Sequence, residues 1–323
     1  MLIYPAYRPI QNGAILRKIE PETCNMHECF ERKKILCKFV QMSVINLIRL
    51  PNLLILCLMM SLTAWMHAIP FSAWLLAIMG SVICVAAAGN VWNDICDVRT
   101  DAINKPHKNY IRNLPRVRYL YLFLNIVGWL LAVISAIQGY YFTILFVFPA
   151  SLLLYVYSTH LKPRPVWGNL LVSLLSALPL IMIMMMARDS LIPEKIRLTA
   201  YYAIFAFLLS WIREVAKDIE DIPGDVQAGY RTLPITGGVD ISKTFMFVLI
   251  ALLTVHAIRW TWWLTNWQLP TYILFCMAFI ILLPLPIFVY LIFSAHEQND
   301  YRRLGLALKG WMLAGVLSMI LWV

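Results

Sequence analysis

Residues 166–187 read VWGNLLVSLLSALPLIMIMMMA, an apolar run without a single charged side chain. A helix that crosses the hydrocarbon core of a bilayer needs about 20 mostly apolar residues. Eight other runs have a similar character, and none alternates between apolar and polar residues as a barrel strand does. The sequence therefore predicts an all-α integral membrane protein with nine transmembrane helices. The predicted spans are 44–66, 70–92, 117–138, 140–159, 166–187, 198–213, 244–264, 270–293 and 305–323.

The composition of the whole chain agrees with this class. Of the 323 residues, 61% are hydrophobic and 14% are charged, whereas a soluble domain has about 45–50% apolar and about 25% charged residues. Too few polar side chains are present to cover a soluble surface, which excludes a soluble enzyme, a disordered chain and a fibrous repeat. The formal net charge is +10, but no nucleic-acid recognition motif accompanies it, so we expect no nucleic-acid partner.

The distribution of basic residues predicts the orientation in the membrane. With the N-terminus in the cytoplasm, all but four of the 27 Lys and Arg residues fall on the cytoplasmic side. The exceptions are Arg188, Lys195, Arg197 and Arg259. By the positive-inside rule we expect a multi-pass protein of the inner (plasma) membrane with a cytoplasmic N-terminus.

The first 43 residues differ from the rest of the chain. Residues 1–43 are polar and basic and show no signal peptide, so we expect an N-terminal extension before a membrane domain at 44–323. Met42 directly precedes the first predicted span. It is therefore an alternative start of the protein.

The acidic residues are concentrated in two short windows. Eight of the 17 lie either in NDICDVRTD, residues 93–101, or in REVAKDIEDIPGD, residues 213–225. Each window follows an apolar run at its predicted cytoplasmic end. Acidic residues scattered through solvated loops would not be distributed in this way, so the two windows are the candidate functional sites.

The spacing within each window predicts shared helix faces. Asn93, Asp97 and Asp101 are four residues apart, and residues at this spacing lie on one face of a helix. Asp218 and Asp221 are related in the same way at a spacing of three. Pro223 and Gly224 follow them, so Asp225 is expected in a turn after the helix.

Clustered carboxylates need a compensating cation to remain ionised. Oxygen ligands suit Mg²⁺, which binds few carboxylates and bridges to substrate phosphates. Basic residues that could also neutralise phosphate stand among the acids: Arg99, Lys105, Lys108, Arg213, Lys217 and Arg231. We therefore predict a magnesium-diphosphate site. Solvated salt-bridged loops and a proton or cation transporter are the alternatives, but transporter acids lie near the bilayer midplane, where these spans have almost no charge.

Both windows resemble signatures of the UbiA superfamily of intramembrane prenyltransferases. The first is Asn93-Asp94-x-x-Asp97-x-x-x-Asp101 followed by Asn104-Lys105-Pro106. The second is Lys217-Asp218-Ile219-x-Asp221-x-x-Gly224-Asp225 with Gly229-Tyr230-Arg231-Thr232-Leu233-Pro234. Arg49-Leu50-Pro51-Asn52, Tyr157-Ser158, Leu161-Lys162 and Gly168-Asn169 are also similar to family segments. The resemblance covers about residues 44–323 and implies nine helices around a central cavity, with the active site at the cytoplasmic face.

The resemblance also implies an activity and roles for individual residues. Members of the superfamily use Mg²⁺ to join a polyprenyl diphosphate to a lipophilic acceptor. The implied metal-binding residues are Asn93, Asp97, Asp101, Asp218, Asp221 and Asp225, and the implied catalytic residues are Asp97, Asp101, Asp221, Asp225 and Lys217. The implied substrate-binding residues are Asp94, Lys105, Arg213, Arg231, Tyr157 and Lys162. Pro223 departs from the family pattern, where an acidic residue is common.

The acceptor is the least determined part of the prediction. The second window is most similar to that of digeranylgeranylglyceryl phosphate synthases, which favours transfer of a geranylgeranyl group to a prenylated glycerol phosphate. Lys162, Arg164 and Arg231 would then supply charge for the acceptor phosphate. Homogentisate prenyltransferases share much of the same pattern, so an aromatic quinone precursor is the main alternative. A non-catalytic membrane scaffold or transporter is the alternative of another class, and the sequence leaves the oligomeric state open.

Overall fold

The structure is a computed structural model that describes residues 44–104, 114–190, 192–266 and 271–322. The extension at 1–43 and the candidate residue Lys105 lie outside these ranges. Every regular element within the ranges is helical, which confirms the predicted all-α class. The residues from Ile45 onward form one compact unit.

Helices follow one another along this unit with short connections. Its first half contains α2 (Leu50–Met66), α3 (Ala73–Cys96), α4 (Val98–Asn104), α5 (Leu114–Ile137), α6 (Phe142–Val156), the π-helical turn η1 (Tyr157–Leu161) and α7 (Trp167–Met184). Its second half contains η2 (Met185–Ser190), α8 (Pro193–Glu220), α9 (Ile222–Gln227), α10 (Leu233–Thr236), α11 (Gly238–Thr265), α12 (Thr271–Ile281), α13 (Pro284–Ser294), α14 (Gln298–Ser318) and η3 (Met319–Trp322).

Eight helical segments in the described ranges are long and apolar enough to cross a membrane, so the protein is a multi-pass membrane protein. The ninth predicted span is not confirmed. Helix α2 is apolar but has 17 residues, because the run predicted at 44–66 is interrupted at Arg49. The backbone of Arg49 is left-handed, with φ 55° and ψ 54°, and Pro51 then occupies the first turn of α2, where proline is tolerated.

Two helices extend further toward the polar connections than the predicted spans. Helix α8 takes in most of the second acidic window and has 28 residues, instead of ending at residue 213. Helix α14 begins at Gln298, because Glu297 and Asp300 form a capping box there. Arg302 and Arg303, which precede the predicted span 305–323, therefore lie on a helix.

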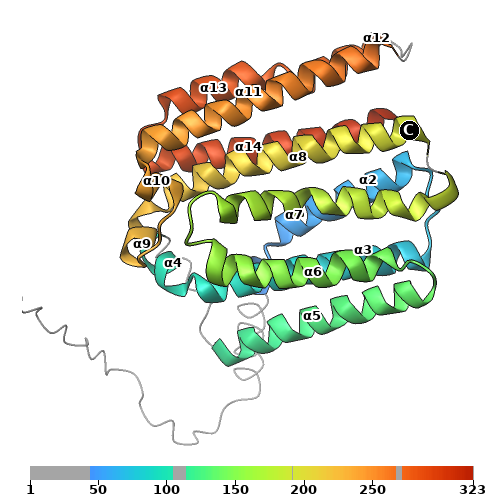
Figure 1. The fold of residues 1–323 in the computed structure, drawn as a ribbon, viewed down its shortest axis with the longest axis horizontal. Coiled ribbons are helices and arrows are strands. Elements are labelled where there is room, and N and C mark those ends of the chain that lie inside the picture. The colour runs from blue at the N-terminus through green and yellow to red at the C-terminus, as the bar shows by residue number, and fades with distance from the viewer. Residues whose placement is uncertain (1–43, 105–113, 191, 267–270, 323) are drawn as a thin grey trace, which may run out of the picture. The chain divides into compact units, whose positions relative to one another are not determined.

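The arrangement of the helices places both acidic windows at one end of the unit. Helix α8 packs against α7, α11 and α14, and α3 packs against α5 and α6. Figure 1 shows α4 and α9 near each other at the left end of these long helices. The packing of the long helices thus brings together α4 and α9, the short helices that contain the last acidic residue of each window.

Candidate functional site

The first acidic window spans a junction between two helices. Helix α3 ends at Cys96, Asp97 has φ −86° and ψ 2°, and α4 begins at Val98. The amide of Asp101 still donates to the Asp97 carbonyl at 2.8 Å. The chain thus changes helix at the central carboxylate, where the spacing alone predicted one helix face. The Asn93 side-chain amide donates to Asp97 Oδ2 at 2.7 Å, so these two side chains remain adjacent.

The second window has the same geometry. Helix α8 ends at Glu220, Asp221 has φ −92° and ψ 2°, and α9 follows. Pro223 lies in the first turn of α9, where its missing N–H removes no helical hydrogen bond. The prediction that Asp225 lies in a turn is therefore wrong: it is a buried residue in the first turn of α9.

The two windows meet through Asn104 at the end of α4. Its side-chain amide donates to the Asp221 carbonyl at 2.9 Å, and its Oδ1 accepts from the Gly224 amide at 2.8 Å. The backbones approach so closely here that a Cβ on Gly224 would lie 2.7 Å from the Thr100 carbonyl oxygen. A glycine at position 224 is thus required for the contact between α4 and α9.

The connection between α6 and α7 contacts both windows. Lys162 Nζ forms an ion pair and hydrogen bond with Asp97 Oδ2, and the charge of Asp225 also acts on it. Burial opposes a charge on Lys162, but the Asp97 carboxylate, together with Tyr157 and Asp225, outweighs burial and raises the Lys162 pKa above its ordinary value. On the other side, Asn169 Nδ2 donates to Asp218 Oδ2 at 2.7 Å. Lys162 therefore neutralises charge shared by the two windows.

The described residues do not present a ready-made metal cluster. Within them, no three His, Cys, Asp or Glu side chains are grouped as the ligands of one ion. Asp97 Oδ1, however, is buried and has no hydrogen-bond partner, although its other carboxylate oxygen has two. A buried carboxylate oxygen without a partner is typical of a site that binds a cation or a water molecule.

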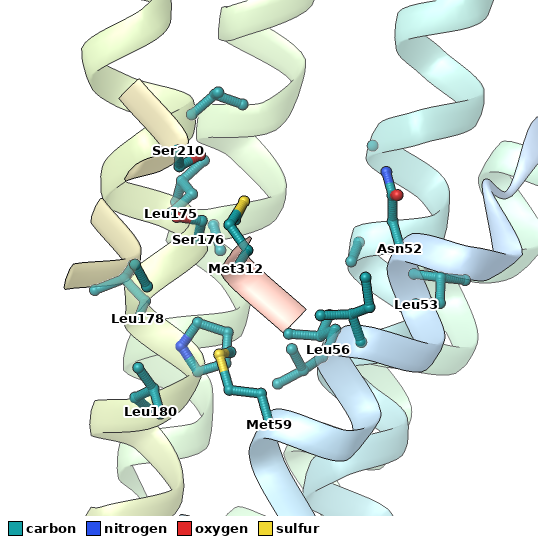
Figure 2. Close-up of a pocket in the computed structure, with 18 of the residues that line it drawn as sticks. Asn52, Leu53, Leu56, Met59, Leu175, Ser176, Leu178, Leu180, Ser210 and Met312 are labelled. Carbon is teal, nitrogen blue, oxygen red and sulfur yellow. The ribbon is translucent and has the colours of Figure 1, made fainter. Parts of the chain in front are cut away.

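A cavity of about 330 Å³ opens beside the windows, between α2, α3, α6, α7, α8 and α14. Most of its wall is apolar, and in Figure 2 Met59 and Leu180 lie toward one end while Asn52 and Ser210 lie toward the other. The polar part of the wall includes Arg49, Asn93, Tyr157, Arg213, Glu214, Lys217 and Lys309. The cavity thus combines a charged end with a long apolar remainder.

Ion pairs order the charged end of the cavity. Arg49 pairs with Asp94 at 2.7 Å. Glu214 accepts from Arg213 at 2.7 Å and from Lys217 at 3.0 Å. Glu214 is buried, with 7% of its surface exposed, so it fixes both cations beside the cavity.

Most of the predicted site residues are brought together, but two are placed elsewhere. The side chains of Arg231 and Arg164 are exposed and do not line the cavity. The Arg231 backbone instead donates to the Pro163 carbonyl at 2.8 Å, which holds the chain beside the α6–α7 connection. Lys162 is engaged by Asp97. None of the three cations expected at an acceptor phosphate therefore lines the cavity.

Sequence reasoning missed three charged groups in the cavity wall: Arg49, Glu214 and Lys309. Glu214 and Arg49 belong to segments that were singled out, but nothing in their spacing distinguished them as cavity residues. Lys309 had a clear signal, because it is a charged residue inside the apolar run 305–323.

The sequence of this chain matches the UbiA prenyltransferase family over residues 53–320. It is 34% identical over 184 residues to digeranylgeranylglyceryl phosphate synthase of Methanothermobacter thermautotrophicus, covering 55% of this chain and 62% of that protein. It is 38% identical over 155 residues to the protein of the same name from Pyrococcus abyssi, covering 47% and 52%. The chain thus spans about half to three fifths of the length of these relatives.

Solved structures of related proteins share the fold. One concerning digeranylgeranylglyceryl phosphate synthase in membranes has a TM-score of 0.64 and 22% identity, covering 87% of this chain and 98% of that one. A UbiA homologue from Archaeoglobus fulgidus bound to GPP and Mg²⁺ has a TM-score of 0.57 and 15% identity, covering 86% and 99%. At these identities the likeness concerns the fold alone.

Proposed function

Because the chain belongs to the UbiA prenyltransferase family, we propose that it transfers a polyprenyl group, geranylgeranyl, from its diphosphate to a prenylated glycerol phosphate. The observation that carries the proposal is the junction of two acidic windows beside a cavity that is charged at one end and apolar elsewhere. A prenyl diphosphate likewise has a charged end, the diphosphate, and an apolar remainder, the prenyl chain. The relatives named digeranylgeranylglyceryl phosphate synthase support the choice of acceptor.

The carboxylates of the two windows fit Mg²⁺ held jointly by protein and substrate. Magnesium typically takes one or two carboxylates, keeps several waters and binds substrate phosphates, so the lack of a three-carboxylate cluster in the described residues is compatible with it. The partnerless Asp97 Oδ1 is a suitable ligand. We propose as metal-binding residues Asn93, Asp97, Asp101, Asp218, Asp221 and Asp225. When bound, the ion neutralises charge on the diphosphate oxygens.

The remaining roles follow from the cavity. Lys217, fixed by Glu214, binds phosphate oxygens and stabilises the charge of the departing diphosphate. The apolar wall holds the prenyl chain and excludes water from the reacting carbon, and the buried Tyr157 lines the polar part of the cavity. The acceptor hydroxyl oxygen bonds to the first prenyl carbon. The diphosphate leaves with the electron pair of the broken C–O bond and takes the hydroxyl proton.

We also propose the placement of the protein in its membrane. The basic residues favour the inner (plasma) membrane, a cytoplasmic N-terminus and an active site at the cytoplasmic face. Helix α2 would then be a short ninth membrane helix. Residues 44–323 would form the prenyltransferase domain, and residues 1–43 an extension to it.

The test is a transfer assay on membranes that contain the full chain. Geranylgeranyl diphosphate and Mg²⁺ would be supplied with geranylgeranylglyceryl phosphate and dihydroxynaphthoate together, and products identified by mass. We expect an ether lipid, and we expect Asp97→Asn and Asp221→Asn each to abolish it, as chelation of Mg²⁺ should. Asp240→Asn, an exposed acid on α11, is the matched control and should retain activity.

Each other result has a distinct meaning. If the product is a prenylated naphthoate, the acceptor is an aromatic compound and not the glycerol phosphate. Full activity in both window variants would refute the metal-site assignment. Absence of either product and of diphosphate release would favour a scaffold or transporter.

A further inference from the structure

Lys309 is a charged residue in the middle of a membrane-spanning helix. It lies about 16 Å from the start of α14, at a rise of about 1.5 Å per residue, and within the candidate span Gln298–Trp322. Charged side chains inside such spans are costly and usually have a partner or a function. Lys309 forms no ion pair with any residue that the structure describes.

The side chain of Lys309 faces the cavity and other cations. It lines the cavity together with Arg49, Arg213 and Lys217, and the charges of Arg213 and Arg49 act on it. Among the described residues, Glu214 is the one carboxylate in the wall, and Arg213 and Lys217 already share it. The described part of the cavity therefore carries an excess of positive charge, which a bound anion would balance.

Arg213 has unused hydrogen-bonding capacity at the same place. Its Nη1 donates to Glu214, whereas its Nε is buried and has no hydrogen-bond partner. A phosphate monoester carries up to two charges and three acceptor oxygens, enough for a lysine and an arginine together. A neutral ligand would leave the charge of Lys309 uncompensated and Arg213 Nε without an acceptor.

We propose that Lys309 and Arg213 bind the phosphate of the acceptor lipid. This inference rests on the proposed function and specifies where the acceptor headgroup lies. The donor diphosphate is assigned to the windows that end α3 and α8, whereas Lys309 is on α14, which carries no window acid. Two anions in one active site need separate cations, and Lys309 on α14 supplies one that lies outside both windows.

The experiment compares Lys309→Met with Lys309→Arg in the full chain. Methionine is apolar and unbranched, so it suits a membrane helix. We expect Lys309→Met to raise the KM for geranylgeranylglyceryl phosphate by about 10- to 100-fold, the loss of one hydrogen bond between charged groups. The KM for geranylgeranyl diphosphate should stay within about twofold, since this proposal gives Lys309 no contact with the donor. Lys309→Arg, which keeps the charge, should restore most of the acceptor affinity, and Arg302→Met, an exposed cation on the same helix, should change neither KM.

A binding measurement separates this proposal from the proposed function. The probes are geranylgeranylglyceryl phosphate and geranylgeranylglycerol, which lacks the phosphate, and the readout is the shift in unfolding temperature of the detergent-solubilised protein. The wild type should prefer the phosphate form, and Lys309→Met should lose that preference. If the preference depends on Lys309 but no ether lipid forms, the site stands and the proposed function fails.

Three results would overturn the acceptor-phosphate site. One is an unchanged acceptor KM in Lys309→Met while the ether lipid still forms, which leaves the proposed function intact. Another is an equal rise in both KM values, which would assign Lys309 to the donor diphosphate. The third is an equal stabilisation of the wild type by the two probes.

Discussion

The pair formed by Asp97 and Lys162 has a structural consequence besides its place in the site. Asp97 is 4% exposed and Lys162 is partly buried, so both charges have lost much of their water. A buried ion pair adds little net stability, but removing one partner leaves an uncompensated charge. Burial disfavours the Lys162 ammonium, but Asp97, with smaller effects of Tyr157 and Asp225, more than compensates, so the pKa of Lys162 is raised.

We therefore predict that Lys162→Met destabilises the protein by about 3–5 kcal/mol, the cost of an unpaired buried charge. The double variant Asp97→Asn/Lys162→Met should recover most of that loss while remaining inactive. Denaturant unfolding in detergent measures the stability, and the transfer assay measures the activity. Equal stabilities of the single and double variants would show that the pair is not coupled.

The same pair makes the stability of the folded protein depend on pH, and the raised pKa of Lys162 fixes the direction of this dependence. A raised lysine pKa contributes stability that is fully present below the unfolded value of about 10.4 and is lost as the pH rises through the higher folded value. The wild type should therefore lose stability above pH 10 more steeply than the double variant. Unfolding curves between pH 8 and the alkaline limit of the protein, taken on both, would test this.

At the scale of the elements, the two windows have the same backbone geometry. An aspartate with ψ near 0° directly follows the last residue of each long helix, and a short helix begins at the next residue. The amides of Asp101 and Asp225 donate to the carbonyls of Asp97 and Asp221 across the two junctions. This geometry turns both short helices so that α4 and α9 pack together.

A substitution of Gly224 tests whether the contact between α4 and α9 is needed for activity. A Cβ at this position would lie 2.6 Å from Asn104 Nδ2 and 2.7 Å from the Thr100 carbonyl oxygen, so α4 and α9 must separate. We expect Gly224→Ala to cost about 1–3 kcal/mol of stability. It should lower transfer by about 100-fold, because a displacement of about 1 Å is enough to misalign reacting groups.

Gly310→Ala is the matched control for this substitution. It lies on α14, and a Cβ there meets nothing within 4 Å. Alanine is the better helix former by about 1 kcal/mol, so the control should be at least as stable as the wild type and fully active. Equal activity of Gly224→Ala and the wild type would contradict a role for the α4–α9 contact.

The two windows also show which features of the site can be predicted from the sequence and which cannot. The spacing of Asn93, Asp97 and Asp101 correctly identified residues that lie near one another, because helical hydrogen bonding continues across the junction. It could not reveal the break at Asp97, since no proline or glycine marks it. Pro223 did mark the second break, but a proline is compatible with both a turn and the first turn of a new helix.

At the scale of the molecule, the packing of the helices determines which cationic side chains face the cavity, and the local sequence pattern does not. Arg231 was predicted as a site residue from the motif around it, whereas Lys309 was not singled out. The fold exposes the Arg231 side chain and turns Lys309 into the cavity. Which cation faces the cavity depends on how α14 packs against α8 and α2, and this is not encoded in either segment alone.

The orientation of the whole protein is the last prediction, and α11 offers the means to test it. Its 28 residues extend about 42 Å, more than the hydrocarbon core of about 30 Å, so its two ends must lie on opposite sides of the membrane. Thr236 precedes α11 and Asn266 follows it, and both side chains are exposed.

In a cysteine-free version of the full chain, a membrane-impermeant thiol reagent should label Asn266→Cys in intact cells. It should label Thr236→Cys only in inverted vesicles, because the acidic windows lie at the Thr236 end of the helices and basic residues concentrate there. The opposite pattern would place the active site on the outer face and refute the proposed cytoplasmic N-terminus.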